Sequence, residues 1–401
     1  MSDGTTEKPP MGRPNLGPRL VTGGESADRP FRFFDNREKY LLFVTTCSEK
    51  WAVGERIGQE LAHIEPRPPA LRLFDAGMGD ATVLTRVMRH IHRRFPAVPV
   101  LIVAKEVSLE DVRLGLEKMA DRFFEHPETV LVITNMRYSE APRLVPDASS
   151  GAMTSAINWH EVPLSGDSTH QFDEQIRALQ PVIAEGWRTR TSEKSGNPLY
   201  VMPSVLVLYR EDRKFVLDSI IPRPGEGVEG YDLILASQPY QARRDAEVKT
   251  RTVLAPLTRA LAPGGRLVLI QSTGRDPGME IIRAIWPDEN PFVTPRKVLI
   301  EELRKQLGEE VERYRFESEP DHRHEFRFTL HTLPDEVGNN IGTSTLLAAW
   351  NAAVYVSQIE DTRMTEALGS DAYLNATWEV LQKYGGLWFI DESFVVERLR
   401  A

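Results

Sequence analysis

The chain has 401 residues, of which 41% are hydrophobic and 27% are charged. That length can bury a full α/β core and suits one large domain or two. The net charge of −9 argues against nucleic acid or an anionic membrane as the main partner, because both require a basic surface. The single cysteine excludes an intramolecular disulfide framework, and no stretch approaches the roughly 20 apolar residues that span a bilayer. We therefore expect a globular enzyme in the cytoplasm.

Composition and periodicity divide the chain into four parts. Residues 1–30 are rich in glycine, proline and polar residues, which predicts a flexible tail. Residues 31–138 are expected to hold N-terminal helices and the first half of the main domain, and residues 231–401 its second half. Residues 139–230 interrupt the alternation of expected strands and helices. We therefore interpret them as an inserted subdomain that acts as a lid, a substrate element or a dimer arm.

Strands and helices alternate along the main domain. Expected strands cover 71–77, 99–106, 129–135, 231–237 and 266–273, and amphipathic helices follow the first two at 82–95 and 108–124. Such alternation predicts a Rossmann-like α/β fold with a mostly parallel sheet. The final segment, 387–400, is expected to add a late antiparallel strand. Within the insertion, 204–221 is predicted to form a hairpin that turns at residues 210–213.

A glycine turn follows the first expected strand, and a helix begins immediately after it. Gly77 and Gly79 let backbone amides approach a ligand, while the helix N-terminus favours negative charge, here a cofactor carboxylate. Glu106 ends the second strand, where it can accept hydrogen bonds from a ribose diol. Thr82 stands where a dinucleotide-binding turn requires its third glycine. These features favour a nucleoside cofactor that is not a dinucleotide.

These residues resemble class I S-adenosylmethionine-dependent methyltransferases. The segment Asp75-Ala-Gly77-Met-Gly79 is similar to their motif I, Glu106 to their ribose-binding acid, and residues 261–267 to their turn before strand 5. The resemblance implies a methyltransferase with S-adenosyl-L-methionine as cofactor and S-adenosyl-L-homocysteine as product. It further implies that cofactor contacts include three residues at later strand ends: Asn135, Met136 and Ser237.

A narrower resemblance is to the histamine N-methyltransferase type of small-molecule enzymes. The segment from Cys47 to Lys50 and the segment from Tyr231 to Tyr240 are similar to parts of that family. The resemblance implies an amine acceptor, with Glu49, Gln238 and Tyr240 as candidate catalytic residues. Glu49 is equally consistent with a solvated helical face, and Tyr240 with a packing role. The asparagine of the family's final strand is not reproduced, and Asp391 is the nearest candidate.

Three other hypotheses follow from the sequence. Asp321, His322, His324 and His331 contain metal-ligand side chains, but on a strand His331 faces away from the other histidines, so we expect no metal. A methyltransferase for proteins or peptides that docks them on the insertion is the alternative to a small-molecule enzyme. A non-catalytic S-adenosylmethionine-binding protein is the third, and a homodimer through the insertion is compatible with each.

Overall fold

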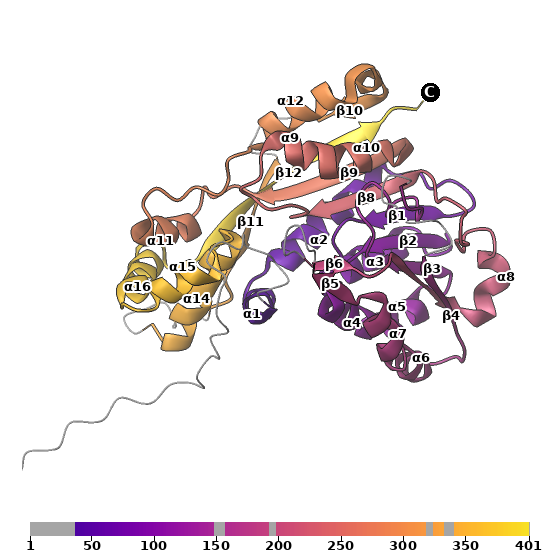
Figure 1. The fold of residues 1–401 in the computed structure, drawn as a ribbon, viewed down its shortest axis with the longest axis horizontal. Helices are drawn as coiled ribbons and strands as arrows, with labels where there is room; N and C mark the ends of the chain where they lie inside the picture. The colour runs from indigo at the N-terminus through magenta and orange to yellow at the C-terminus, as the bar shows by residue number, and fades with distance from the viewer. Residues whose placement is uncertain (1–36, 148–156, 192–197, 318–323, 333–340, 401) are drawn as a thin grey trace, which may run out of the picture. The chain divides into compact units, whose positions relative to one another are not determined.

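A single large sheet organises the part of the chain that this computed structural model describes, which is residues 37–147, 157–191, 198–317, 324–332 and 341–400 (Figure 1). The expected tail, 1–30, lies outside that part. Within it, the strand order is β10-β12-β9-β8-β1-β2-β3-β7-β4, with β11 also paired to β12. The strands are β1 (Leu71–Asp75), β2 (Val100–Lys105), β3 (Thr129–Thr134), β4 (Asn158–Leu164), β7 (Ser204–Arg210), β8 (Tyr231–Ser237), β9 (Leu261–Ser272), β10 (Tyr314–Phe316), β11 (Glu325–Thr329) and β12 (Trp388–Arg398).

The centre of the sheet is parallel. Strand β1 lies between β2 and β8, and the register places Leu73 opposite both Ile102 and Leu233. Strands β3 and β9 extend the parallel set on either side, whereas β12 runs antiparallel to β9. The Rossmann-like sheet with a late antiparallel strand, predicted from the sequence, is confirmed. All these parallel strands end at one edge of the sheet, where ligands bind in open α/β folds.

Helices cover both faces of the sheet and gather near its strand ends (Figure 1). Their bounds are α1 (Arg37–Thr46), α2 (Glu49–Glu60), α3 (Thr82–Arg94), α4 (Leu109–Glu117), α5 (Ala120–Glu125), α6 (Thr169–Arg177), α7 (Gln180–Gly186), α8 (Lys214–Leu217), α9 (Ala246–Lys249), α10 (Ala255–Arg259), α11 (Pro277–Ile285), α12 (Arg296–Leu307), α14 (Thr343–Val356), α15 (Asp361–Ala367) and α16 (Ala372–Tyr384). A π-helical turn, Thr250–Leu254, joins α9 to α10.

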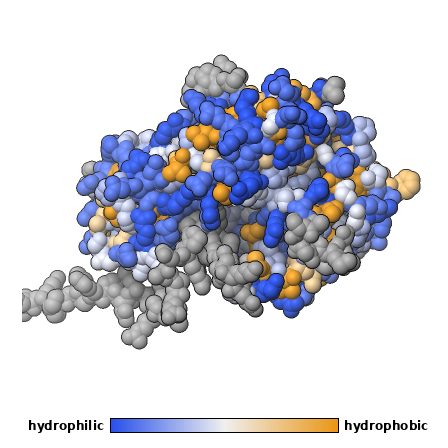
Figure 2. Space-filling model, turned by 45° about the horizontal axis from the view of Figure 1, so that its top comes forward, coloured by the Kyte–Doolittle hydropathy of each residue, from blue (hydrophilic) through white to orange (hydrophobic). Residues whose placement is uncertain are grey.

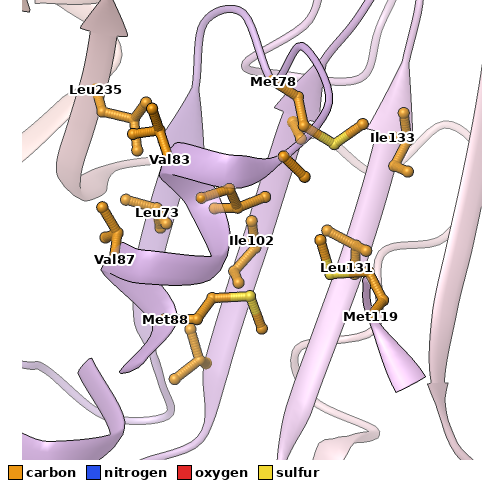
Figure 3. Packing of buried hydrophobic residues seen from close by; sticks show 14 of the residues in the cluster. Leu73, Met78, Val83, Val87, Met88, Ile102, Met119, Leu131, Ile133 and Leu235 are labelled. Atoms are coloured by element: carbon orange, nitrogen blue, oxygen red, sulfur yellow. The ribbon is translucent and has the colours of Figure 1, made fainter. Parts of the chain in front are cut away.

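Alternating strand residues build a separate core on each face, because successive side chains point to opposite sides of a strand. On one face, Leu73 and Ile102 pack against α3 through Val83, Val87 and Met88 (Figure 3). The other face packs against α10 and α12. A third cluster joins α1, α11, α14 and α16 to the start of β12. The strand tips are therefore enclosed by helices from both ends of the chain.

The segment 139–230 extends the sheet. Strand β7 pairs antiparallel with β3, β4 pairs parallel with β7, and the short strands β5 (Thr189–Thr191) and β6 (Pro198–Tyr200) pair with each other. The predicted hairpin at 204–221 is wrong in its second strand, because Glu211–Arg213 is a 3-10 turn that leads into α8. Both edges of β7 are already occupied by β3 and β4, which leaves no position for a hairpin partner.

The bulge that opens β9 places Gly265 against backbone. A Cβ atom on Gly265 would lie 2.2 Å from the carbonyl oxygen of Tyr231, whereas one on Gly342 would meet nothing within 4 Å. We expect Gly265→Ala to lower the free energy of unfolding by about 1–3 kcal/mol, since the strand pair must shift. Urea unfolding measures the change, and Gly342→Ala is the matched control. Equal stability of the two variants would contradict the packing of this bulge.

Candidate functional site

Asp75 and Gly77 lie at the tip of β1, where Asp75 is buried and Gly77 is exposed. The carboxylate Oδ1 of Asp75 accepts the Gly77 N–H at 3.0 Å, while Oδ2 is buried and has no hydrogen-bond partner among the described residues. A Cβ atom on Gly77 would meet nothing within 4 Å. Burial and the nearby Glu106 carboxylate raise the pKa of Asp75 to about 7, against the opposing effect of the Gly77 N–H. A buried, unpartnered acid two residues from an exposed glycine suits a cationic group of a ligand.

Glu106 joins the glycine turn to the tip of β2. Its Oε2 accepts the Gly79 N–H at 2.6 Å, and its Oε1 accepts the N–H groups of Val107 and Ser108 at 2.6 and 2.8 Å. Gly79 has φ +52, which a residue without a side chain adopts readily. The structure thus brings Gly77, Gly79 and Glu106 together. Ribose binding by Glu106 remains a prediction, and Oε2 keeps one lone pair for it.

The amides of the turn are already used within the protein. Gly77 donates to Asp75, Gly79 to Glu106, and Asp80 to the hydroxyl of Tyr40 at 3.2 Å. Contact between these amides and a ligand remains a prediction, and in this structure each amide has a partner within the protein. The physical reason is that buried N–H groups take protein acceptors where these are present. The turn provides space at Gly77 rather than free donors.

Helix α1 closes over the turn through Tyr40, which the sequence did not single out. Its hydroxyl donates to Oδ1 of Asp80 at 3.1 Å, and a Cβ on Gly79 would lie 2.8 Å from it. Lys118 donates to Oδ2 of Asp80 at 2.5 Å. Burial opposes ionisation, but bonds from Lys118 and Thr82 hold the pKa of Asp80 below its ordinary value. Asp80 is thus a charged anchor for the loop.

Glu49 is buried rather than on a solvated helical face. Its side chain forms an ion pair with Lys50 at 3.1 Å. Burial opposes the charge on Lys50, but Glu49, Tyr355 and Asp80 raise the pKa of Lys50 above its ordinary value. Lys50 also acts electrostatically on Asp75. Lys50 therefore lies among the acids of the site, and its place next to Glu49 is the signal for it in the sequence.

Asp391 is the second acid with an unpartnered oxygen. It is fully buried at the start of β12, and its Oδ1 accepts the Ser272 hydroxyl at 2.8 Å. Its Oδ2 has no hydrogen-bond partner in the described part of the chain, and neither has the hydroxyl of Ser237 at the tip of β8. Burial and the nearby Glu49 carboxylate raise the pKa of Asp391 well above its ordinary value. The resemblance had offered Asp391 only as a nearest candidate.

Gln238 is linked to Asp391 by hydrogen bonds through the hydroxyl of Ser272. Its Nε2 donates to the Ser272 hydroxyl at 2.8 Å, and its backbone has φ +49. A residue other than glycine held in this region costs about 1 kcal/mol or more, and such strain collects at functional sites. Tyr240 donates to Oε1 of Gln271 at 2.8 Å. Gln238 and Tyr240 both line a cavity of about 350 Å³ beside the tips of β8 and β9, called here the Gln238 pocket.

The two residues predicted to contact adenine follow β3. The side-chain amide of Asn135 donates to the Gly186 carbonyl at 3.0 Å and accepts the Ser204 N–H at 2.9 Å. Asn135 therefore holds the insertion against the main sheet. Met136 is buried in the core on the α10 and α12 face. Adenine binding by either residue remains a prediction.

Metal-ligand side chains are not assembled in the described ranges. No group of three or more His, Cys, Asp or Glu residues there has the arrangement of a metal site. His324 and His331 lie in that part, and Asp321 and His322 lie outside it. In the same ranges, none of the helices has both the length and the apolar character needed to span a bilayer.

The mostly parallel sheet, with acids at the carboxyl ends of its strands, is a Rossmann-like α/β fold. The residues present fit S-adenosylmethionine, the cofactor that the sequence resemblance implies. Asp75 Oδ2 offers an acceptor for its ammonium, the space beside Gly77 admits its backbone, and Glu106 retains an acceptor position for a ribose hydroxyl.

No protein-family model matches the chain, and no curated protein matches its sequence. The solved structures to which it is similar include a geranyl diphosphate methyltransferase in complex with GPP and sinefungin, with 13% identity over 87% of this chain and 78% of that one, and a TM-score of 0.31. Another is phosphoethanolamine N-methyltransferase 2 of Haemonchus contortus, with 13% identity over 88% of this chain and 53% of that one, and a TM-score of 0.27. The rRNA methyltransferase aviRa of Streptomyces viridochromogenes has 16% identity over 55% of this chain and 72% of that one, and a TM-score of 0.23. Their names give different acceptors, so none transfers to this chain.

The raised pKa of Asp75 predicts a pH dependence of stability. The folded chain keeps the Asp75 proton up to about pH 7, whereas an unfolded chain loses it near pH 4. Stability from this residue is therefore complete below about pH 4 and declines as the pH rises toward 7. Asp75→Asn keeps an acceptor for Gly77 but does not titrate. Urea unfolding between these pH values should show the wild type losing stability relative to Asp75→Asn, and parallel curves would contradict the burial of this acid.

Proposed function

We propose that this chain is an S-adenosylmethionine-dependent methyltransferase that methylates a small molecule, with an amine as the favoured acceptor. The observation that carries the proposal is the pair of unpartnered carboxylate oxygens on Asp75 and Asp391, at the same edge of one sheet with β8 and β9 between their strands. Buried acids without partners are costly unless a bound cation completes them. The cofactor and an amine acceptor each supply a positive charge.

The cofactor would be held from three sides. Asp75 would accept from its ammonium, Glu106 from its ribose, and Lys50, a charged amine that acts on Asp75, would meet its carboxylate. Asn135 and Met136 are the candidates for the adenine side, and Ser237 is a further candidate for cofactor contact. When bound, the cofactor supplies an electrophilic methyl group on a sulfonium. Lys50 is a cation beside the motif residues, and the sequence alone did not suggest it as a cofactor contact.

Transfer of a methyl group to an amine requires alignment, exclusion of water and removal of one proton. Asp391 and Glu49 would hold an ammonium acceptor and take its proton. The chain from Gln238 through Ser272 to Asp391 would fix the position of the nitrogen. Tyr240 would close the wall of the pocket, because its hydroxyl is engaged with Gln271.

The location of the insertion supports a small-molecule acceptor. Trp187 donates to the Glu106 carbonyl at 2.9 Å and Tyr200 to the Val107 carbonyl, so the insertion packs on the ribose side of the site. The Gln238 pocket lies on the other side of β1, and its volume suits a small ligand. Cytoplasmic location and a homodimer remain predictions.

Gly77→Leu tests cofactor binding without disturbing the core. The new side chain would enter the open space, so we expect stability to change by less than about 0.5 kcal/mol. Binding of S-adenosylhomocysteine should be lost, because the leucine occupies the volume that the ligand needs. Calorimetry with the wild type and the variant measures both effects. A wild type that binds neither S-adenosylmethionine nor its product would refute the proposed function.

Gln238→Gly tests the acceptor side. Glycine adopts φ +49 without strain, so the variant should be at least as stable as the wild type. Loss of the amide should lower the rate of methyl transfer by about 10- to 100-fold, through weaker placement of the acceptor, and leave the affinity for S-adenosylhomocysteine unchanged. Product release and calorimetry give the two values. An unchanged rate would remove Gln238 from the site.

A further inference from the structure

The lining of the Gln238 pocket is rich in positive charge. Lys249, Arg275 and Arg283 line it, and Glu392 is the acid among its described lining residues. This local excess of cations occurs in a chain whose net charge is −9. Composition therefore does not explain it, and the cations must be either engaged within the protein or available to a ligand.

Two of the charged groups are engaged within the protein. Lys249 is buried, and its Nζ donates to the Ala242 carbonyl at 2.7 Å and to the hydroxyl of Thr294. Glu392 accepts from the Gln271 amide at 2.8 Å and from the Arg296 N–H at 2.9 Å. These contacts hold the wall of the pocket in place.

The two arginines differ in their surroundings. Arg275 pairs with Glu325, and its NH2 group is also 3.8 Å from a carboxylate oxygen of Glu392. Arg283, on α11, is exposed and has no carboxylate at ion-pair distance in the part of the chain that the structure describes, although Asp276 acts on it at longer range. Arg283 is therefore the cation that can meet an anionic group entering the pocket.

The remaining lining suits an aromatic or apolar body. Tyr240 and Phe292 contribute rings, and a Cβ on Gly274 would lie 2.2 Å from the ring of Phe292, which shows how closely that ring approaches the backbone. A cavity of about 350 Å³ limits this body to a small molecule. Polar contacts to Gln238 at one end and Arg283 in the same lining would orient such a ligand.

We propose that the methyl acceptor carries an anionic group, a carboxylate or a phosphate, that Arg283 binds in the Gln238 pocket. The inference rests on the proposed function, because the ligand is a methyl acceptor only if the chain is a methyltransferase. Binding of an anion in the pocket can be tested without methyl transfer. Arg283 is a specificity determinant in this proposal and has no part in the transfer of the methyl group.

The test uses calorimetry with benzoate and benzamide, which differ mainly in charge, on the full chain with and without S-adenosylhomocysteine. We expect benzoate to bind at least about tenfold more tightly than benzamide, and Arg283→Ala to weaken benzoate by about tenfold or more without affecting benzamide. Arg283→Lys should retain part of the preference. Arg251→Ala is the matched control, because Arg251 is an exposed arginine outside the pocket, and it should leave benzoate binding unchanged.

The outcomes separate the two proposals. Equal binding of benzoate and benzamide, no binding of benzoate, or an Arg283→Ala variant that binds benzoate like the wild type would overturn the anion subsite. Phenyl phosphate that binds more tightly than benzoate would support a phosphate as the anionic group. Failure of S-adenosylhomocysteine to bind would refute the proposed function. Benzoate binding to the wild type and to the Arg283 variants would still show whether the anion subsite exists.

Discussion

The site depends on one carboxylate that accepts hydrogen bonds from three backbone N–H groups. Glu106 accepts from Gly79, Val107 and Ser108, and so joins the glycine turn after β1 to the loop after β2. Bonds to a charged acceptor are stronger than neutral ones. Because both loops follow buried parallel strands, this carboxylate fixes the separation of two loops whose chain positions are 27 residues apart. The open space beside Gly77 exists because that separation is fixed.

The chemistry of the site arises from acids that the fold buries without full partners. Asp75 and Asp391 each keep one carboxylate oxygen unbonded in the described structure, and Lys50, which pairs with Glu49, acts electrostatically on both. Such an arrangement is unfavourable for stability and favourable for a cationic ligand, which is the usual relation between strain and function. On the face shown in Figure 2, hydrophobic residues are scattered among hydrophilic ones.

The insertion has a structural role that its sequence did not reveal. It adds β7 and β4 to the sheet, and Asn135 ties its backbone to the end of β3. Trp187 then donates to the carbonyl of Glu106. The same acid that holds the glycine turn is thereby enclosed by a segment remote in sequence, which excludes water from one side of the site.

The sequence by itself determined the parallel sheet, its late antiparallel strand and the meeting of the glycine turn with Glu106. These follow from local patterns, because hydrophobic runs specify buried strands and the ends of parallel strands share one edge. It could not show that Tyr40 and Lys50 lie beside these acids, nor that β7 pairs with β3 instead of forming a hairpin. Those features depend on contacts between segments far apart in the chain, and a local pattern carries no information about which distant segment a buried polar group will face. The tertiary structure decided them by bringing helices from the N-terminal region and a strand from the C-terminal region to the same edge.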